Sequence, residues 1–166
     1  MNQNIGFQTW IGNVDVKSKP TYFYVQRNES WSTQGAPIIF NVEKVNIGNA
    51  MDTSTGIFTA SRKGTYFFAF SGLGSFPFNG SSKLLYVHLL QNGNNVGFSY
   101  VLTNENDVYD SLSLQATLQL EAGDRVWLEM EVRTRDASLY DSGSHYNHFV
   151  GWLLEEDMSS SFSKML

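Results

Sequence analysis

The chain has 166 residues, of which 42% are apolar and 14% are aromatic, and its net charge at neutral pH is −5. This length suits one domain, and an acidic balance without a basic stripe argues against nucleic acid as a partner. The absence of cysteine excludes disulfides, thiol catalysis and thiolate-bound zinc. The first residues show no signal peptide and no apolar run is long enough for a membrane span, so we expect no membrane insertion.

Short aromatic and β-branched runs, separated by turn residues, predict strands along most of the chain. No helical periodicity of useful length accompanies them, and Asn92-Gly93 is a strong hairpin signal between two of the runs. Regular spacing of short strands is typical of an all-β sandwich or barrel. The predicted strands are residues 21–27, 38–45, 64–71, 84–91, 96–102, 112–120, 125–133 and 146–154.

The third predicted strand is apolar on both faces. Tyr66, Phe68 and Phe70 share one face, because successive side chains of a strand point to opposite sides. Phe67 and Ala69 lie on the other face. A strand of this kind is buried on both sides, or is buried on one side and covered by a partner subunit on the other.

Leucines alternate with polar residues along residues 112–120, which is the clearest period-2 pattern in the chain. A second alternation follows in residues 125–133. Together with the aromatic strand, these patterns predict one hydrophobic core. The residues expected to be mostly buried are Phe58, Tyr66, Phe68, Phe70, Leu114, Leu118, Val126, Leu128, Phe149 and Leu153.

The spacing of several residues between Phe40 and Phe70 resembles the signature of the C1q domain, with Met51 where the signature has an aromatic residue or Leu. The residues that carry this resemblance are Phe40, Asn46, Phe58, Gly64, Tyr66, Phe68 and Phe70. Residues 114–116, 122–128 and 149–154 are similar to the closing strands of C1q domains. The resemblance covers residues 20–157, and the invertebrate, lectin-like members look most similar.

The resemblance implies a ten-stranded jelly-roll sandwich of the C1q/TNF-like type that forms homotrimers, which fits the two-sided apolar strand. We therefore expect an N-terminal segment at residues 1–19, a C1q-like globular domain at residues 20–157 and a C-terminal tail at residues 158–166. The resemblance also implies a secreted, extracellular protein.

Calcium is the expected cofactor, because several C1q-like trimers hold this ion near the distal end of the threefold axis. Residues 104–110 read NENDVYD and are rich in oxygen ligands, as a hard cation requires. Asp107 and Asp110 are the expected ligands, although the second carboxylate of the family's site is missing near residues 101–102. The alternative is an Asn/Asp-rich turn without metal.

Ligand binding is expected on loops. Trp31 lies in a polar loop, where an exposed aromatic ring can stack on a sugar, and Asn104 and Asn106 belong to the oxygen-rich segment. The alternative for Trp31 is packing against its own loop. Asn28 and Asn79 begin two N-glycosylation sequons in predicted loops.

We expect no enzymatic activity. His145 and His148 are three residues apart in or beside a strand, so they point to opposite faces and do not chelate one ion together. Glu129 and Glu131 share a strand face, where a charged surface pairing with Arg133 is a better interpretation than an acid–base pair. No nucleophile elbow or phosphate-binding loop is present.

The resemblance and the residues together predict a non-enzymatic, trimeric binding module. The first interpretation is a soluble, lectin-like pattern-recognition protein of innate immunity that engages glycans or microbial surfaces, with avidity from three weak sites. The alternative is a trimerising structural or signalling head, like those of short-chain collagens or cerebellins, whose partner is a protein.

Overall fold

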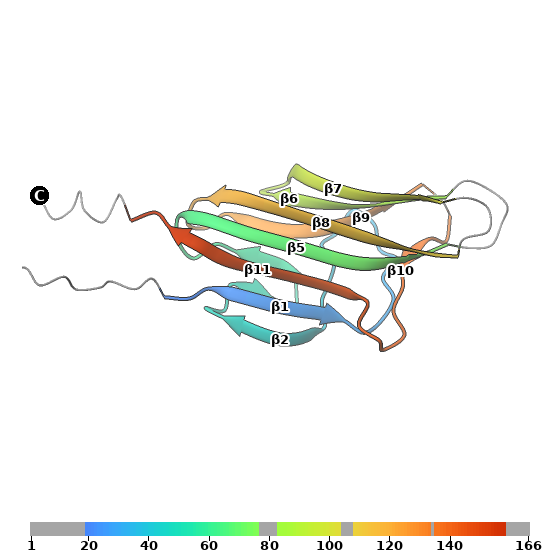
Figure 1. Cartoon of the computed structure of the whole chain (residues 1–166), viewed down its shortest axis with the longest axis horizontal. Helices are drawn as coiled ribbons and strands as arrows, with labels where there is room; N and C mark the ends of the chain where they lie inside the picture. The colour runs from blue at the N-terminus through green and yellow to red at the C-terminus, as the bar shows by residue number, and fades with distance from the viewer. Residues whose placement is uncertain (1–18, 77–82, 104–107, 134, 159–166) are drawn as a thin grey trace, which may run out of the picture.

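The computed structural model describes residues 19–76, 83–103, 108–133 and 135–158. These residues form two antiparallel sheets packed face to face (Figure 1), as the sequence predicts. Within the described ranges no helix is long and apolar enough to cross a bilayer. The predicted boundaries of the terminal segments stay predictions.

The first sheet, called sheet A, is built around one long strand, β5. β8 pairs along one edge of β5, whereas β10 and β11 pair in succession along its other edge, followed by β1 and β2. The strands of sheet A are β1 (Tyr22–Arg27), β2 (Val42–Ile47), β5 (Gly64–Ser75), β8 (Tyr109–Leu120), β10 (Ser138–Leu139) and β11 (Asn147–Glu156).

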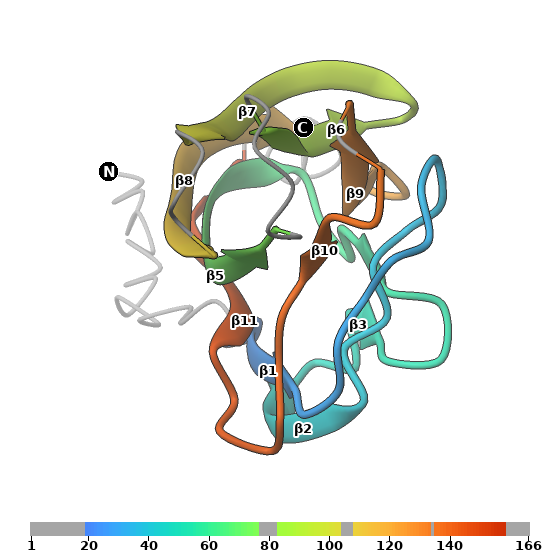
Figure 2. The same cartoon turned by 90° about the vertical axis from the view of Figure 1, so that its right-hand side faces the viewer.

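The second sheet, called sheet B, has the order β3-β4-β9-β6-β7. Figure 2, which looks along the strands, shows the two sheets around the core. The described strands number eleven rather than ten, because the sandwich includes two-residue strands such as β10. The strands of sheet B are β3 (Met51–Asp52), β4 (Ile57–Thr59), β6 (Lys83–Gln91), β7 (Asn94–Thr103) and β9 (Arg125–Val132).

The predicted parity of the aromatic strand is confirmed. Tyr66, Phe68 and Phe70 of β5 face the core and are 0%, 1% and 3% exposed. Phe67 and Ala69 face the other side of sheet A and are half-buried. One face of β5 is therefore fully buried in the core, and the rest of the chain covers its other face only in part.

Aromatic rings dominate the middle of the core. The ring centroids of Phe58 and Phe68 lie 5.2 Å apart, and those of Phe23 and Phe149 lie 5.0 Å apart, both edge to face. Such pairs add about 0.5–1.5 kcal/mol each beyond their area burial. Two expected core residues, Leu118 and Leu153, are only half-buried, because Leu118 lies on the edge strand β8 and Leu153 adjoins a register shift in β11.

Gly151 lets β11 approach the aromatic core. A Cβ atom at this position would lie 2.6 Å from Cε1 of Phe23 and 2.7 Å from Cδ1 of Phe68. Both distances are shorter than carbon atoms tolerate, so the rings occupy the space that any side chain would need.

Several predicted boundaries are wrong in detail. β5 continues to Ser75 and β8 begins at Tyr109, because the two residues pair and extend the ladder, so the loop predicted from residue 73 starts later. Ile38 and Phe40 are fully buried but precede β2. The Asn92-Gly93 hairpin between β6 and β7 is confirmed, with positive φ at both residues.

Candidate functional site

The loops that follow β1 and precede β11 meet at one end of the sandwich. Arg27, the last residue of β1, pairs with Asn147, the first residue of β11. This end lies on the right of Figure 1, away from the points where the chain enters β1 and leaves β11. We call it the distal end. Of the predicted binding residues that the structure describes, Trp31 pairs with Leu139 and Asp110 pairs with Gly74 at this end.

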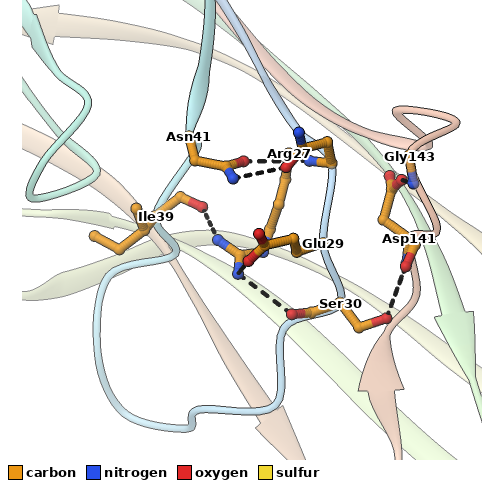
Figure 3. Close-up of polar contacts among 8 residues, drawn as sticks. Arg27, Glu29, Ser30, Ile39, Asn41, Asp141 and Gly143 are labelled. Atoms are coloured by element: carbon orange, nitrogen blue, oxygen red, sulfur yellow. Dashed lines mark hydrogen bonds and ion pairs between the residues drawn. The ribbon is translucent and has the colours of Figure 1, made fainter.

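Arg27 is a buried cation beneath the distal loops. Its Nη1 atom donates to the carbonyl of Ile39 at 2.5 Å and its Nη2 atom donates to the carbonyl of Ser30 at 3.3 Å (Figure 3). Burial lowers the pKa of Arg27 from its ordinary value, because desolvation penalises the charged form. The guanidinium carbon lies 4.7 Å from the centre of the Trp31 ring, which adds a cation–π contact.

Asp141 organises the turn before β11. Its carboxylate accepts the backbone N–H groups of Gly143, His145 and Tyr146 at 2.9, 3.0 and 2.7 Å. Burial alone would raise the pKa of Asp141, but these donors outweigh it and hold the pKa below its ordinary value. The main chain of Asp141 also exchanges two 3.1 Å hydrogen bonds with the hydroxyl of Ser30, which joins the turn to the first distal loop.

Three tyrosine rings gather beside this turn, and the sequence-based interpretation did not find them. The ring centroids of Tyr109 and Tyr140 lie 4.9 Å apart, and those of Tyr140 and Tyr146 lie 6.1 Å apart. Tyr109 and Tyr146 are exposed. Desolvation and the neighbouring phenols raise the pKa of Tyr109. The cluster therefore offers apolar ring faces beside phenol hydroxyl groups.

The predicted ligand residues are only partly within the described chain. Trp31 is half-buried, packs against the core, and pairs through its backbone with Leu139. Trp31 therefore packs on the core and on β10 and not only against its own loop, and a role in binding stays a prediction. Asn104 and Asn106 lie outside the described residues.

The calcium prediction is also open. Asp107 lies outside the described residues, and Asp110 is an exposed residue of β8 whose Oδ1 atom accepts the N–H of Ser111 at 2.7 Å. Among the residues that the structure describes, no group of three or more His, Asp or Glu side chains is arranged to hold a metal ion.

Among the remaining polar candidates, the side chains of His148, Glu131 and Arg133 have structural partners. His145 has a positive φ and precedes β11, whereas His148 lies within it, 3.1 Å from the hydroxyl of Tyr24. The predicted charged pairing is confirmed, because Arg133 Nε lies 3.3 Å from a carboxylate oxygen of Glu131. These contacts explain the side chains without assigning them chemistry.

The outer face of sheet A is unusually apolar. The rings of Phe67 and Trp152 lie 4.5 Å apart across β5 and β11, and Trp152 and Tyr22 remain exposed in the single chain. Beside them lies a hollow of about 470 Å³. Its apolar lining on this face includes Tyr22, Tyr24, Val45, Val150 and Trp152.

Residues 22–154 match the profile of the C1q domain. The chain belongs to the C1q domain family. Its sheet order and aromatic core are thus those of a C1q-type sandwich, and the resemblance seen in the sequence is confirmed.

Similar proteins include mouse complement C1q tumor necrosis factor-related protein 3, which is 36% identical over 126 residues, covering 76% of this chain and 48% of that protein. Zebrafish caprin-2 is 34% identical over 125 residues, covering 75% of this chain and 13% of that protein. The chain therefore spans about half or less of the length of these relatives. Both are vertebrate proteins, and the expected likeness to invertebrate lectin-like members stays a prediction.

Among solved structures, the globular domain of zebrafish complement 1qA protein superimposes with a TM-score of 0.61 at 22% identity. The match covers 82% of this chain and 99% of that one. At this identity the likeness supports the fold, whereas the ligand depends on this chain's own surface residues.

Proposed function

We propose that this chain is a secreted, non-enzymatic binding module that acts as a homotrimer. The observation that carries the proposal is the outer face of sheet A, where Phe67, Trp152 and Tyr22 form an apolar surface on a C1q-type sandwich. A contiguous apolar surface on a soluble domain marks an interaction site. Closed threefold symmetry would cover it in every copy at once.

The oligomeric state is tested by light scattering on the full chain at micromolar concentration. The expected mass is that of three chains. A single-chain mass at that concentration would contradict the proposal.

The ligand surface of this trimer is proposed to lie at the distal end and to engage glycans or microbial surfaces. The exposed rings of Tyr109 and Tyr146 support it, because tyrosine presents an apolar face for a sugar ring and a hydroxyl for its polar groups. Three copies at one end would convert weak single sites into avid binding. Calcium near Asp110 is the proposed cofactor.

A glycan array, probed with and without EDTA, tests this ligand class. The matched variants are Tyr146→Ser at the distal end and Phe98→Ser on sheet B. We expect the first variant to lose glycan signal and the second to retain it. Equal signals from both variants would place the binding elsewhere, and equal signals with and without EDTA would remove calcium.

The second candidate function is a trimerising structural or signalling head whose partner is a protein. The observation that favours it is a set of exposed aromatic and aliphatic side chains on β7 of sheet B, whereas Tyr109 of the proposed glycan surface belongs to β8 of sheet A. Phe98, Tyr100 and Leu102 belong to this set. Protein interfaces are enriched in such aromatic residues, whereas a distal glycan site gives no reason for them.

A further inference from the structure

The outer face of β6 and β7 carries a continuous cluster of rings, which we call the aromatic face. It consists of Tyr86 and His88 on β6 and of Phe98 and Tyr100 on β7. The centroid of Tyr86 lies 5.9 Å from that of Tyr100, and the centroid of His88 lies 6.2 Å from that of Phe98. The register pairs the same residues across the two strands.

β7 exposes its large side chains, whereas Gly97 and Ser99 between them are half-buried. Phe98, Tyr100 and Leu102 are 55%, 56% and 64% exposed. On the opposite side of the strand, Gly97 faces the interior, where a Cβ atom would lie 3.3 Å from the side chain of Leu114. Because exposed apolar area of this kind is unfavourable in water, its presence indicates an interaction surface.

A column of charge lies beside the aromatic face. The register sets Glu131 of β9 opposite Tyr86 and Glu129 opposite His88. Both carboxylates lie on the outer side of sheet B, in the same rows as the rings. The surface therefore runs from charged side chains on β9 to apolar side chains on β7.

Arg133 shows that this surface can hold a cationic side chain. Its guanidinium carbon lies 5.9 Å from the centre of the Tyr86 ring, and its Nε atom lies 3.3 Å from Glu131. The side chain of Arg133 is 69% exposed, so its ion pair contributes little to stability and can be exchanged. An incoming cation can take the same place over the ring and beside the carboxylate.

We propose that the aromatic face and the adjacent carboxylates bind a positively charged, partly apolar segment of a partner protein. Arg or Lys side chains of this segment lie over Tyr86 and reach Glu129 and Glu131. Its aliphatic side chains cover Phe98 and Leu102. This proposal rests on the second candidate function, a protein partner, and is independent of the distal glycan surface.

Charge complementarity favours a cationic protein segment over a second copy of the chain or an anionic lipid surface. A second copy of the chain brings a net charge of −5 and no excess of cations. An anionic lipid surface would be repelled by Glu129 and Glu131. The aromatic face also lies on sheet B, and Figure 1 shows β6 and β7 on the opposite side of the molecule from β1 and β11. The aromatic face is therefore separate from the outer face of sheet A.

The test uses fluorescent synthetic peptides and anisotropy with the full chain. The probe repeats Arg-Ser-Leu-Ser three times, so that Arg and Leu share one face of an extended strand. The two matched peptides replace Arg with Glu or replace Leu with Ser. We expect the probe to bind about tenfold more tightly than either control peptide, because each control lacks one of the two kinds of contact.

Three variants locate the site. Phe98→Ser combined with Tyr100→Ser, and Glu129→Gln combined with Glu131→Gln, are each expected to weaken the probe about tenfold. Arg133→Ser is expected to strengthen it severalfold, because the internal cation no longer competes. Circular dichroism of each variant checks that the fold is retained.

The matched control is Glu29→Gln combined with Glu43→Gln, which removes two carboxylates from sheet A and its adjoining loop. Equal weakening by this pair would show unspecific charge attraction and overturn the proposal. Absence of probe binding, tight binding of the Glu peptide, or undiminished binding after Phe98→Ser and Tyr100→Ser would also overturn it. If Phe98→Ser combined with Tyr100→Ser changed the oligomeric mass, the occupant of the aromatic face would be a second copy of the chain. If it changed glycan binding, the occupant would be a glycan.

The experiments that disprove the homotrimer differ from those that disprove peptide binding at the aromatic face. A chain that sediments as a monomer would disprove the homotrimer, yet it would keep the aromatic face and is expected to bind one peptide per chain. Loss of glycan signal at the distal end would likewise leave the peptide titration unchanged.

Discussion

Phe67 and Trp152 are directly opposite each other across β5 and β11, and their ring centroids lie 4.5 Å apart on the outer face of sheet A. Cross-strand aromatic pairs stabilise a sheet by about 0.2–1 kcal/mol relative to alanine. In the single chain, however, the pair leaves Trp152 37% exposed. A neighbouring copy that covers the pair would bury this surface, which explains why both faces of β5 are apolar.

Trp152→Glu is therefore expected to prevent trimerisation. The substitution places a charge on the apolar face, where burial in an interface would leave it unpaired. Light scattering should then give the mass of one chain, whereas circular dichroism should still show a folded β protein. Phe98→Ser, on sheet B, is the matched control and should keep the three-chain mass. A trimeric Trp152→Glu chain would move the interface away from this face.

Phe68→Ala is expected to lower the free energy of unfolding by about 3–5 kcal/mol, as deletion of a large aromatic side chain from a core does. The residue is 1% exposed and contacts the rings of Phe58 and Phe149. Urea unfolding measures the loss. Phe98→Ala is the matched control, because the same deletion on an exposed face leaves no cavity and should cost far less. An unchanged midpoint for Phe68→Ala would show that the strand parity is wrong.

The core could be predicted from the sequence because period-2 alternation determines which side of a strand is buried. This rule correctly placed Tyr66, Phe68 and Phe70. It does not reveal how open the edge of a sandwich is, so Leu118 on β8 was expected to be more buried than it is. The C1q resemblance added the family, which alternation alone does not distinguish from other sandwiches.

The surfaces could not be predicted in the same way. On β7 the alternation would put Phe98 and Tyr100 inside, yet pairing with β6 places Val87 and Leu85 in the core and turns the large rings outward. The tyrosine cluster was missed because Tyr109 and Tyr140 are far apart in the chain and meet only after folding.

Gly151→Ala is expected to destabilise the chain by about 1–3 kcal/mol, as overpacking of a core does. The new methyl group would occupy space already filled by Phe23 and Phe68. Gly97→Ala is the matched control, since its Cβ atom would meet only the flexible side chain of Leu114 at 3.3 Å. Thermal unfolding of both variants should lower the midpoint for Gly151→Ala alone, and equal midpoints would contradict the close packing of β11.

Calcium binding is expected to depend on Asp110. Calorimetric titration of calcium into the wild-type chain should give a saturable binding heat, and Asp110→Ala should abolish it, because a hard cation needs the carboxylate oxygen. Asp52→Ala, which removes a carboxylate that bonds Ser54 in another turn, is the matched control and should bind as the wild type does. Identical heats for wild type and Asp110→Ala would remove calcium from the function.

Asp141→Asn is expected to destabilise the distal turn in a pH-dependent way. An amide has only one acceptor oxygen, so an N–H group that Asp141 now satisfies would face the amide nitrogen, at a cost of about 1–3 kcal/mol. The pKa of Asp141 is lowered below 3.8, so its stabilisation is complete above that pH and is lost as the pH falls through the lowered value. Urea unfolding should therefore show a wild-type advantage at pH 7 that shrinks below pH 4. If the difference in free energy of unfolding between wild type and Asp141→Asn stayed constant down to the lowest pH at which both are folded, the ionised carboxylate would not be what stabilises the turn.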